Sequence, residues 1–152
     1  MSYLDRVLQP DETVLHRGNI HWLVYWPAAV FLLIALAGLY GYLMYPEQQT
    51  VAIAVTLVGA VGLVIAWLVG FLKRWSTEIA VTNRRVIFKE GLIARRTFEM
   101  NMDKIESVDV DQSVAGRIFN YGTVTVRGVG SGSEPLKRIS SPLELRNRVL
   151  VR

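Results

Sequence analysis

The residues with side chains suited to catalysis or metal binding are few and scattered. The chain of 152 residues has two histidines, His16 and His21, and no cysteine. Their spacing of five makes them neighbours neither on a helix nor on a strand, and no acidic cluster accompanies them, so we predict no metal site. Both histidines precede the first apolar segment, which disfavours a Ser–His–Asp arrangement. We therefore predict that the protein is not an enzyme and uses no cofactor.

Two other patterns suggest binding chemistry, and each has a simpler structural explanation. Asp103, Glu106, Asp109 and Asp111 alternate along a predicted strand, as expected of a solvated face. Residues 128–133 (GVGSGS) resemble a glycine-rich phosphate cradle. Such loops bind phosphate when they follow a strand and open a helix. This run lies between two predicted strands and lacks a Lys-Ser/Thr ending, so we predict a mobile hairpin loop.

Two long apolar segments dominate the first half of the chain. Residues 23–45 and 50–72 each run for 23 residues without a charge, and only four residues separate them. A helix needs about 20 apolar residues to cross a hydrocarbon core of roughly 30 Å. A buried helical hairpin of a soluble protein would need a much larger protein around it. We predict a transmembrane hairpin over 22–72, with no cleavable signal because a second span follows the first.

The charges that flank the spans predict their orientation. The link between the spans has one acidic residue and no lysine or arginine, whereas Arg6 and Arg17 precede the first span and Lys73 and Arg74 follow the second. The positive-inside rule therefore places both termini in the cytoplasm. Residues 73–152 carry 15 of the 17 Lys and Arg residues and 9 of the 13 Asp and Glu residues, a formal charge of +6. This charge either attracts anionic lipids or only fixes the topology.

Small residues recur at packing intervals in both spans. Ala37 and Gly41 form one row, and Gly62, Ala66 and Gly70 form another. Such rows let helices approach closely where lipid provides no hydrophobic driving force. They predict either packing within the hairpin or homo-oligomerisation. Neither span contains a charge, which disfavours a channel or transporter.

After Arg74 the apolar period changes from helical to alternating, which predicts a β domain over 73–152. Turn chemistry at Asn83 and Gly91 separates the first strands. Ser141, Pro142 and Glu144 have the spacing of a capping box that begins a short C-terminal helix. These elements predict a bent sheet covered at one end by that helix. The six predicted strands are residues 75–82, 85–89, 92–100, 105–111, 123–129 and 136–140.

The β region carries a family resemblance over about 50 residues. Five elements recur in order: the TNRRV turn, the glycine that closes the hairpin, DKIESV, QSVAGRIFNYG and TVTV. The run resembles the bacterial membrane-flanked, pleckstrin-homology-like (PH-like) domain family. The resemblance implies a bacterial inner-membrane protein with a PH-like barrel of about seven strands and a capping helix. Residues 12–17, in the cytoplasmic segment 1–21, are predicted to supply the seventh strand. The short terminal helix suggests a barrel closed incompletely or by a neighbouring subunit.

The segment 112–122 (QSVAGRIFNYG) is either a recognition loop or a structural plug. We favour the second interpretation, in which Ile118, Phe119 and Tyr121 fill the barrel and two glycines supply turns.

Basic residues around the first hairpin suggest a collar next to the membrane. Arginine suits bidentate phosphate contacts, so this collar would bind anionic headgroups such as phosphatidylglycerol or cardiolipin. The alternative is that these residues fix the topology and pair with Glu78, Glu90 and Glu99 across the strands. The predicted collar consists of Lys73, Arg74, Arg84, Arg85, Lys89, Arg95 and Arg96.

Together these patterns predict a non-catalytic inner-membrane protein that displays a cytoplasmic PH-like domain. Its expected role is homo-oligomeric scaffolding or recruitment of a protein partner, because edge strands and small-residue rows both favour assembly. The alternative is a monomeric sensor of anionic lipid headgroups. We predict the lipid bilayer as a partner and no nucleic-acid partner.

Overall fold

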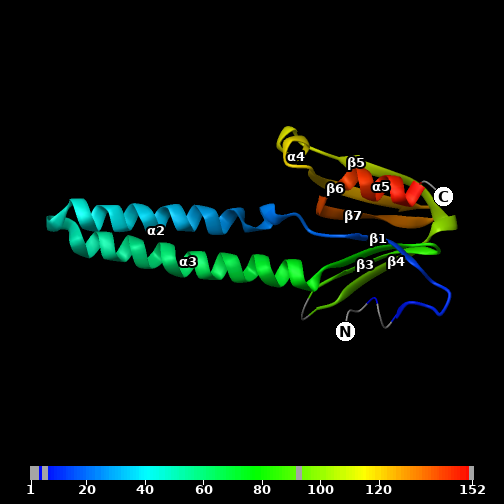
Figure 1. Cartoon of the computed structure of the whole chain (residues 1–152), viewed down its shortest axis with the longest axis horizontal. Helices are drawn as coiled ribbons and strands as arrows, with labels where there is room; N and C mark the ends of the chain where they lie inside the picture. Colours follow the sequence, from blue (N-terminus) through cyan, green and yellow to red (C-terminus); the bar gives the residue numbers. More distant parts are fainter. Residues whose placement is uncertain (1–3, 5–6, 92–93, 151–152) are drawn as a thin grey trace. The chain divides into compact units, whose positions relative to one another are not determined.

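The computed structural model describes residues 4, 7–91 and 94–150 of the chain. The chain forms two compact units, one of which is Trp22–Leu72 and the other Met1–His21 together with Lys73–Arg152. The first is helical and the second is built mainly from strands (Figure 1). We refer to them as the helical unit and the β unit.

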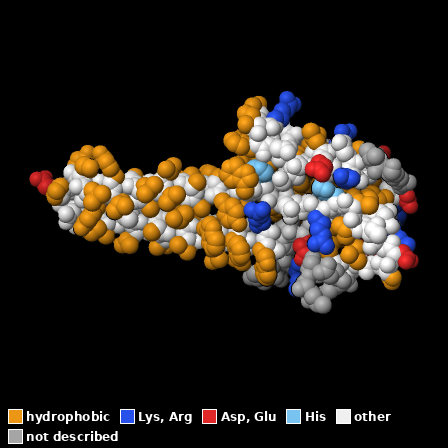
Figure 2. Space-filling model, viewed as in Figure 1, with side chains coloured by type: hydrophobic (Ala, Val, Ile, Leu, Met, Phe, Trp, Pro, Cys, Tyr) orange, Lys and Arg blue, Asp and Glu red, His pale blue; other side chains and the backbone are white. Residues whose placement is uncertain are grey.

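The helical unit is an antiparallel hairpin (Figure 1). A short 3-10 turn, η1 (Trp22–Tyr25), leads into α2 (Trp26–Met44), and η2 (Pro46–Gln48) leads into α3 (Gln49–Ser76). The stretches Trp22–Met44 and Pro46–Ser76 have mean hydropathies of 2.0 and 2.6, so both are long and apolar enough to cross a membrane. Large apolar side chains cover the outer surface of this unit (Figure 2).

Glycines allow the two helices to pack closely. A Cβ added at Gly38 would lie 2.6 Å from the backbone nitrogen of Thr56, and one added at Gly70 would lie 2.8 Å from the ring of Tyr25. Contacts this short do not occur in proteins, so a larger residue at either position would push the helices apart. The glycines therefore set the separation of α2 and α3.

Most of the small residues predicted to pack between helices do so inside the hairpin. Gly41, Gly62 and Gly70 all face side chains of the neighbouring helix. Ala66 is half-buried and Ala37 is exposed. The glycines are thus accounted for by packing within one chain, and homo-oligomerisation stays a prediction.

The β unit contains two antiparallel sheets and short helices at their connections. The four-stranded sheet has the order β1-β2-β3-β4 and the three-stranded sheet the order β5-β6-β7. The strands are β1 (Val14–Gly18), β2 (Glu78–Thr82), β3 (Arg85–Glu90), β4 (Arg96–Asn101), β5 (Ile105–Asp111), β6 (Tyr121–Gly128) and β7 (Ser131–Ser140). The connecting and terminal helices are η3 (Met102–Lys104), α4 (Val114–Ile118) and α5 (Pro142–Leu150).

The helical hairpin is inserted between two strands that are neighbours in one sheet. Val14 pairs with Thr82 and Gly18 pairs with Ile79, so β1 lies beside β2 although residues 22–72 separate them in sequence. The prediction of a seventh strand from the N-terminal segment is confirmed, with β1 one to two residues later than expected. Without the N-terminal segment, the region after the hairpin would therefore lack one strand of the four-stranded sheet.

One core lies between the sheets and α5. Alternating residues of β2 and β3 face buried residues of β5, β6 and β7. A register shift between β6 and β7 allows Leu136 and Ile139 to contribute to the same core although they are three positions apart. Leu145 and Val149 of α5 are 1% and 7% exposed and cover the same core, and Pro142 begins the helix as predicted. The buried cluster consists of Ile79, Val81, Val86, Phe88, Val108, Val124, Leu136, Ile139, Leu145 and Val149.

The segment that follows β1 joins the first sheet to the second. Ile20 forms a bridge with Ile139. The His21 N–H donates to the Arg138 carbonyl at 2.9 Å, and the Ser140 N–H donates to the Asn19 carbonyl at 2.9 Å. These bonds close one corner of the two-sheet structure immediately before the chain enters the helical unit.

Three predicted boundaries were wrong. The strand predicted at 75–82 begins only at Glu78, because α3 continues through Ser76. The strand predicted at 92–100 is observed at Arg96–Asn101, and the part of that prediction at residues 92 and 93 lies outside the described residues. The predicted loop at 128–133 is a two-residue turn, since Gly130 has a φ of 70° and β7 already pairs with β6 at Ser131.

Candidate functional site

The TNRR turn between β2 and β3 holds the N-terminal segment. The Thr82 hydroxyl accepts the N–H groups of Arg84 and Arg85 at 3.2 and 3.0 Å and lies 2.7 Å from Glu12 Oε1, to which it donates. The Asn83 side-chain oxygen accepts the Thr13 N–H at 3.1 Å. The turn residues are thus explained by contacts to a segment 70 positions earlier.

Arg85 is the centre of a buried ion-pair network. Its guanidinium donates to Glu12 at 2.8 and 2.9 Å and to Glu99 at 2.7 Å, and its Nη2 also donates to the Val7 carbonyl at 2.8 Å. The Glu12 side chain is fully buried and the Arg85 side chain is 15% exposed. Hydrogen bonds from Arg85, followed by those from Thr82 and the backbone, lower the pKa of Glu12 from 4.5 to about 2, although burial opposes the shift. Arg85 therefore stabilises the fold.

The β unit has two distinguishable ends. At the first, which we name the junction end, the chain passes between units at Ile20–His21 and Lys73–Thr77. At the second, the turn end, β2 and β3 are joined through Asn83 and Arg84. Because β1 and β2 are antiparallel and Gly18 pairs with Ile79, both crossings lie at the same end of the sheet.

The seven predicted basic residues divide between these two ends. Lys73 and Arg74 lie at the junction end, as does Lys89, which is paired with Glu78 at 3.2 Å. Arg95 precedes β4, and Arg96 pairs with Glu90 at the same end. Arg84 and Arg85 lie at the turn end. The structure does not bring all seven together as one collar, and lipid contact stays a prediction for each of them.

A basic hollow opens at the junction end. It has a volume of about 390 Å³ and is lined by Lys73, Arg96 and Lys137, with Glu90 and Glu134 beside them. Arg96 donates to Glu134 at 2.9 Å. Lys73 and Arg96 also line an adjoining hollow of about 210 Å³. Lys137 was not among the predicted basic residues, because a strand predicted only from residue 136 gave no reason to place it near Lys73.

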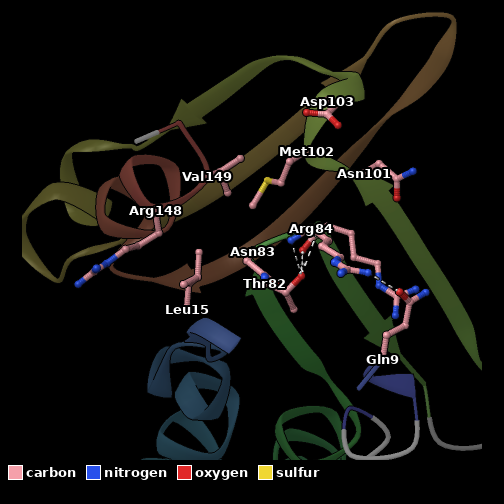
Figure 3. Close-up of a pocket in the computed structure, with 11 residues that line it drawn as sticks. Gln9, Leu15, Thr82, Asn83, Arg84, Asn101, Met102, Asp103, Arg148 and Val149 are labelled. Carbon is pink, nitrogen blue, oxygen red and sulfur yellow. Dashed lines mark hydrogen bonds between the residues drawn. The ribbon is translucent and has the colours of Figure 1, made fainter. Parts of the chain in front are cut away.

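A second hollow, of about 710 Å³, lies at the turn end. Arg84 and Arg148 line it together with apolar side chains from β1, η3 and α5 (Figure 3). The Arg84 side chain is 51% exposed and donates to Gln9 at 3.0 Å. The lining residues are Gln9, Leu15, Thr82, Asn83, Arg84, Arg85, Asn101, Met102, Asp103, Arg148 and Val149.

The two histidines are separated in the fold and have different surroundings. His16 Nδ1 lies 3.8 Å from Glu144. His21 is 5% exposed and stacks on Tyr121 with ring centroids 5.2 Å apart. Burial lowers the pKa of His21 below 6.5, although a hydrogen bond with the Phe119 backbone opposes the shift. Within residues 4, 7–91 and 94–150, no three His, Asp or Glu side chains are grouped to hold a metal ion.

The predicted plug at 112–122 was wrong. Ile118 and Phe119 are 73% and 48% exposed instead of filling the barrel, and Tyr121 is only partly buried beside His21. Their place in the core is taken by Leu145 and Val149 of α5. Apolar composition indicated burial, but the direction in which a short helix turns its side chains depends on tertiary contacts.

Two sheets of four and three strands, each in sequential order and covered by a C-terminal helix, define a PH-like fold. The model of the bacterial PH domain family matches residues 27–151. The chain belongs to this family, whose domains are typically non-catalytic binding modules. Comparison with curated proteins and with solved structures gave no match.

Proposed function

We propose that the protein is a membrane-anchored, non-catalytic PH-like module that binds anionic lipid headgroups at the cytoplasmic face of a bacterial inner membrane. The observation that carries the proposal is the basic hollow at the junction end, lined by Lys73, Arg96 and Lys137. A tethered domain needs little intrinsic affinity for a headgroup, because the tether keeps its local concentration high.

Membrane anchoring is supported by the two apolar helices and by the pairing of β1 with β2. The pairing requires residues before and after the helical hairpin to be on the same side of a membrane, which an even number of crossings satisfies. The charge distribution supports the cytoplasmic side, since Lys73 and Arg74 flank α3 and the link at 46–49 has no basic residue.

Headgroup binding is supported by the chemistry of the hollow. Lys73 and Lys137 are exposed, so both ammonium groups are able to meet a phosphate. Arg96 is already paired with Glu134, so we assign the main attraction to the two lysines. Each cation near an anionic surface contributes about 1 kcal/mol, or roughly fivefold in affinity.

Native mass spectrometry of the full chain in detergent, titrated with phosphatidylglycerol or phosphatidylethanolamine, tests this proposal. We expect phosphatidylglycerol to bind more tightly and the combined Lys73→Gln and Lys137→Gln variant to lose most of this preference. Lys104→Gln is the matched control, because Lys104 is an exposed lysine of η3 at the turn end and does not line the basic hollow. Equal binding of the two lipids by the parent protein would contradict the proposal.

A second candidate function is recruitment of a protein partner or of further copies as a scaffold. The hollow at the turn end favours it, because Arg84 and Arg148 there are accompanied by Leu15, Met102 and Val149. The edge strand β4 offers a further place for strand addition. The same mass spectra test the scaffold, since a homo-oligomer appears at two or more times 17.1 kDa and a monomer at 17.1 kDa.

A further inference from the structure

Helix α4 presents apolar side chains to solvent on a domain whose other large apolar residues mainly form the core. Val114, Ile118 and Phe119 are 78%, 73% and 48% exposed, and they lie within six consecutive residues. Figure 2 shows the hydrophobic side chains gathered over this part of the β unit. A contiguous exposed apolar group of this kind is typical of a surface that meets a membrane or a partner.

The backbone of this segment is held in place, so the exposure is built into the fold. The Ser113 hydroxyl accepts the Gly116 N–H at 3.1 Å, and the Gln112 side chain donates to the carbonyls of Gly116 and Tyr121 at 3.2 and 3.1 Å. A Cβ at Gly116 would lie 2.6 Å from the Tyr121 carbonyl. The QSVAG and NYG motifs therefore fix a short helix with its apolar face outward.

Two contacts locate α4 at the junction end. Tyr121 stacks on His21, and the Phe119 backbone is hydrogen-bonded to the same histidine. His21 is the residue directly before Trp22, where the first apolar stretch begins. The exposed apolar group thus lies next to the point at which the chain leaves the β unit for the helical hairpin.

A basic residue accompanies the apolar group. Arg117 is exposed on α4 between the apolar positions Val114 and Ile118. Apolar side chains that enter the interface, flanked by a cation that stays at the phosphates, are typical of segments that lie at a bilayer surface.

We infer that α4 is an interfacial wedge: Val114, Ile118 and Phe119 enter the headgroup–acyl boundary of the leaflet that anchors the protein, and Arg117 contacts lipid phosphates. This inference rests on the proposed membrane anchoring and adds a second attachment that does not depend on the basic hollow.

Depth-dependent fluorescence quenching tests the wedge in the full chain. The protein has no cysteine, so single cysteines at Ile118, Val129 and Val58 can each carry an environment-sensitive nitrobenzoxadiazole label. Val129 is the matched control, because it is 69% exposed but lies at the turn end, where its N–H donates to the Lys104 carbonyl at 3.0 Å. Val58 is on α3 and reports insertion of the hairpin.

In phosphatidylethanolamine–phosphatidylglycerol vesicles, we expect a blue-shifted emission for the Ile118→Cys label, quenched most by nitroxides placed shallowly on the lipid chains. The Val129→Cys label should be quenched by aqueous iodide only, and the Val58→Cys label most by deep nitroxides. Replacing Arg117 with Gln should remove the extra quenching of the Ile118→Cys label that phosphatidylglycerol gives over phosphatidylcholine.

Three results would overturn the inference, and they differ in meaning. If the label at 118 is quenched by iodide only, like the label at 129, while lipid nitroxides quench the label at 58, the wedge is wrong but the hairpin is inserted in the membrane. If the label at 58 is not quenched by lipid nitroxides, anchoring itself fails. A label at 118 shielded from both iodide and lipid nitroxides would mean that a protein surface covers α4.

Discussion

Replacing Glu12 with glutamine removes one charge from the buried network that connects the N-terminal segment to the TNRR turn. The substitution keeps the shape of the side chain and leaves Arg85 with Glu99 as its remaining charged partner. Glutamine keeps one acceptor oxygen but places an amide NH2 where the other carboxylate oxygen accepts two hydrogen bonds, so the change removes the charge together with those two bonds.

The pKa of Glu12 sets the magnitude of the effect. The fall from 4.5 to about 2 corresponds to roughly 3 kcal/mol in favour of the folded state, at about 1.4 kcal/mol per unit. Because the folded-state pKa is depressed, this stability is fully present above pH 4.5 and is lost as the pH falls toward 2. Removing one partner of a buried pair costs a similar amount, about 3–5 kcal/mol.

A single buried cysteine provides the assay. Val124 is fully buried in the core of the β unit, so a Val124→Cys thiol reacts only when the sheets open. At pH 7 we expect Glu12→Gln to raise the labelling rate about 100-fold, which is the conversion of roughly 3 kcal/mol. With 4,4′-dithiodipyridine, which reacts with thiols in acid, the difference from the parent should shrink as the pH falls below 4.5.

The control is Glu106→Gln, which removes an exposed carboxylate from β5. We expect its labelling rate to stay within about twofold of the parent, as for most surface substitutions. The reasoning fails if Glu12→Gln also stays within that range at pH 7, or if its effect is the same at pH 7 and near pH 3.

Three further outcomes follow from the geometry. Gly116→Ala should speed labelling of the Val124→Cys thiol at least tenfold, because the added Cβ would lie 2.6 Å from the Tyr121 carbonyl. The control Ala115→Ser should leave the labelling rate close to that of the parent. Gly38→Val should separate α2 from α3 at Thr56 and lower the melting temperature of the helices in detergent, measured by far-UV circular dichroism. The control Leu36→Val changes an exposed residue and should leave this melting temperature within a few degrees of the parent. The β unit should lose stability as the pH falls below 6.5, because burial disfavours the protonated form of His21 in the folded state. His21→Phe should remove this dependence of stability on pH in the same labelling assay.

Strong local patterns predicted a large part of the fold from the sequence. The two uncharged runs predicted the helical hairpin, and alternating apolar residues around Asn83 predicted the first strand pair. The seventh strand at Val14–Gly18 was predictable because the resemblance required one more strand than the pattern after the spans supplied. These features depend on neighbours in sequence or on a known strand number.

The features that escaped prediction depend on distant contacts. Glycines near residue 130 suggested a loop, but pairing between β6 and β7 continues to Gly128 and Ser131 and leaves only a two-residue turn. Arg85 was grouped with lipid-facing residues because its partner, Glu12, is 73 positions away. Ile118 was predicted in the core because it is apolar, and apolar composition alone does not show that Leu145 and Val149 of α5 fill the core.

The insertion of the hairpin between β1 and β2 has a consequence for biosynthesis. β1 is made first and has no sheet partner until both apolar helices and then β2 have followed it, since Val14 pairs with Thr82. The long delay adds little to the entropy of closing the connection, because that cost grows only with the logarithm of chain length. If the hairpin spans a membrane as proposed, a nascent chain that inserted just one helix would leave β1 and β2 on opposite sides of the bilayer. With the proposed anchoring, the four-stranded sheet can be completed only after both helices have crossed the membrane.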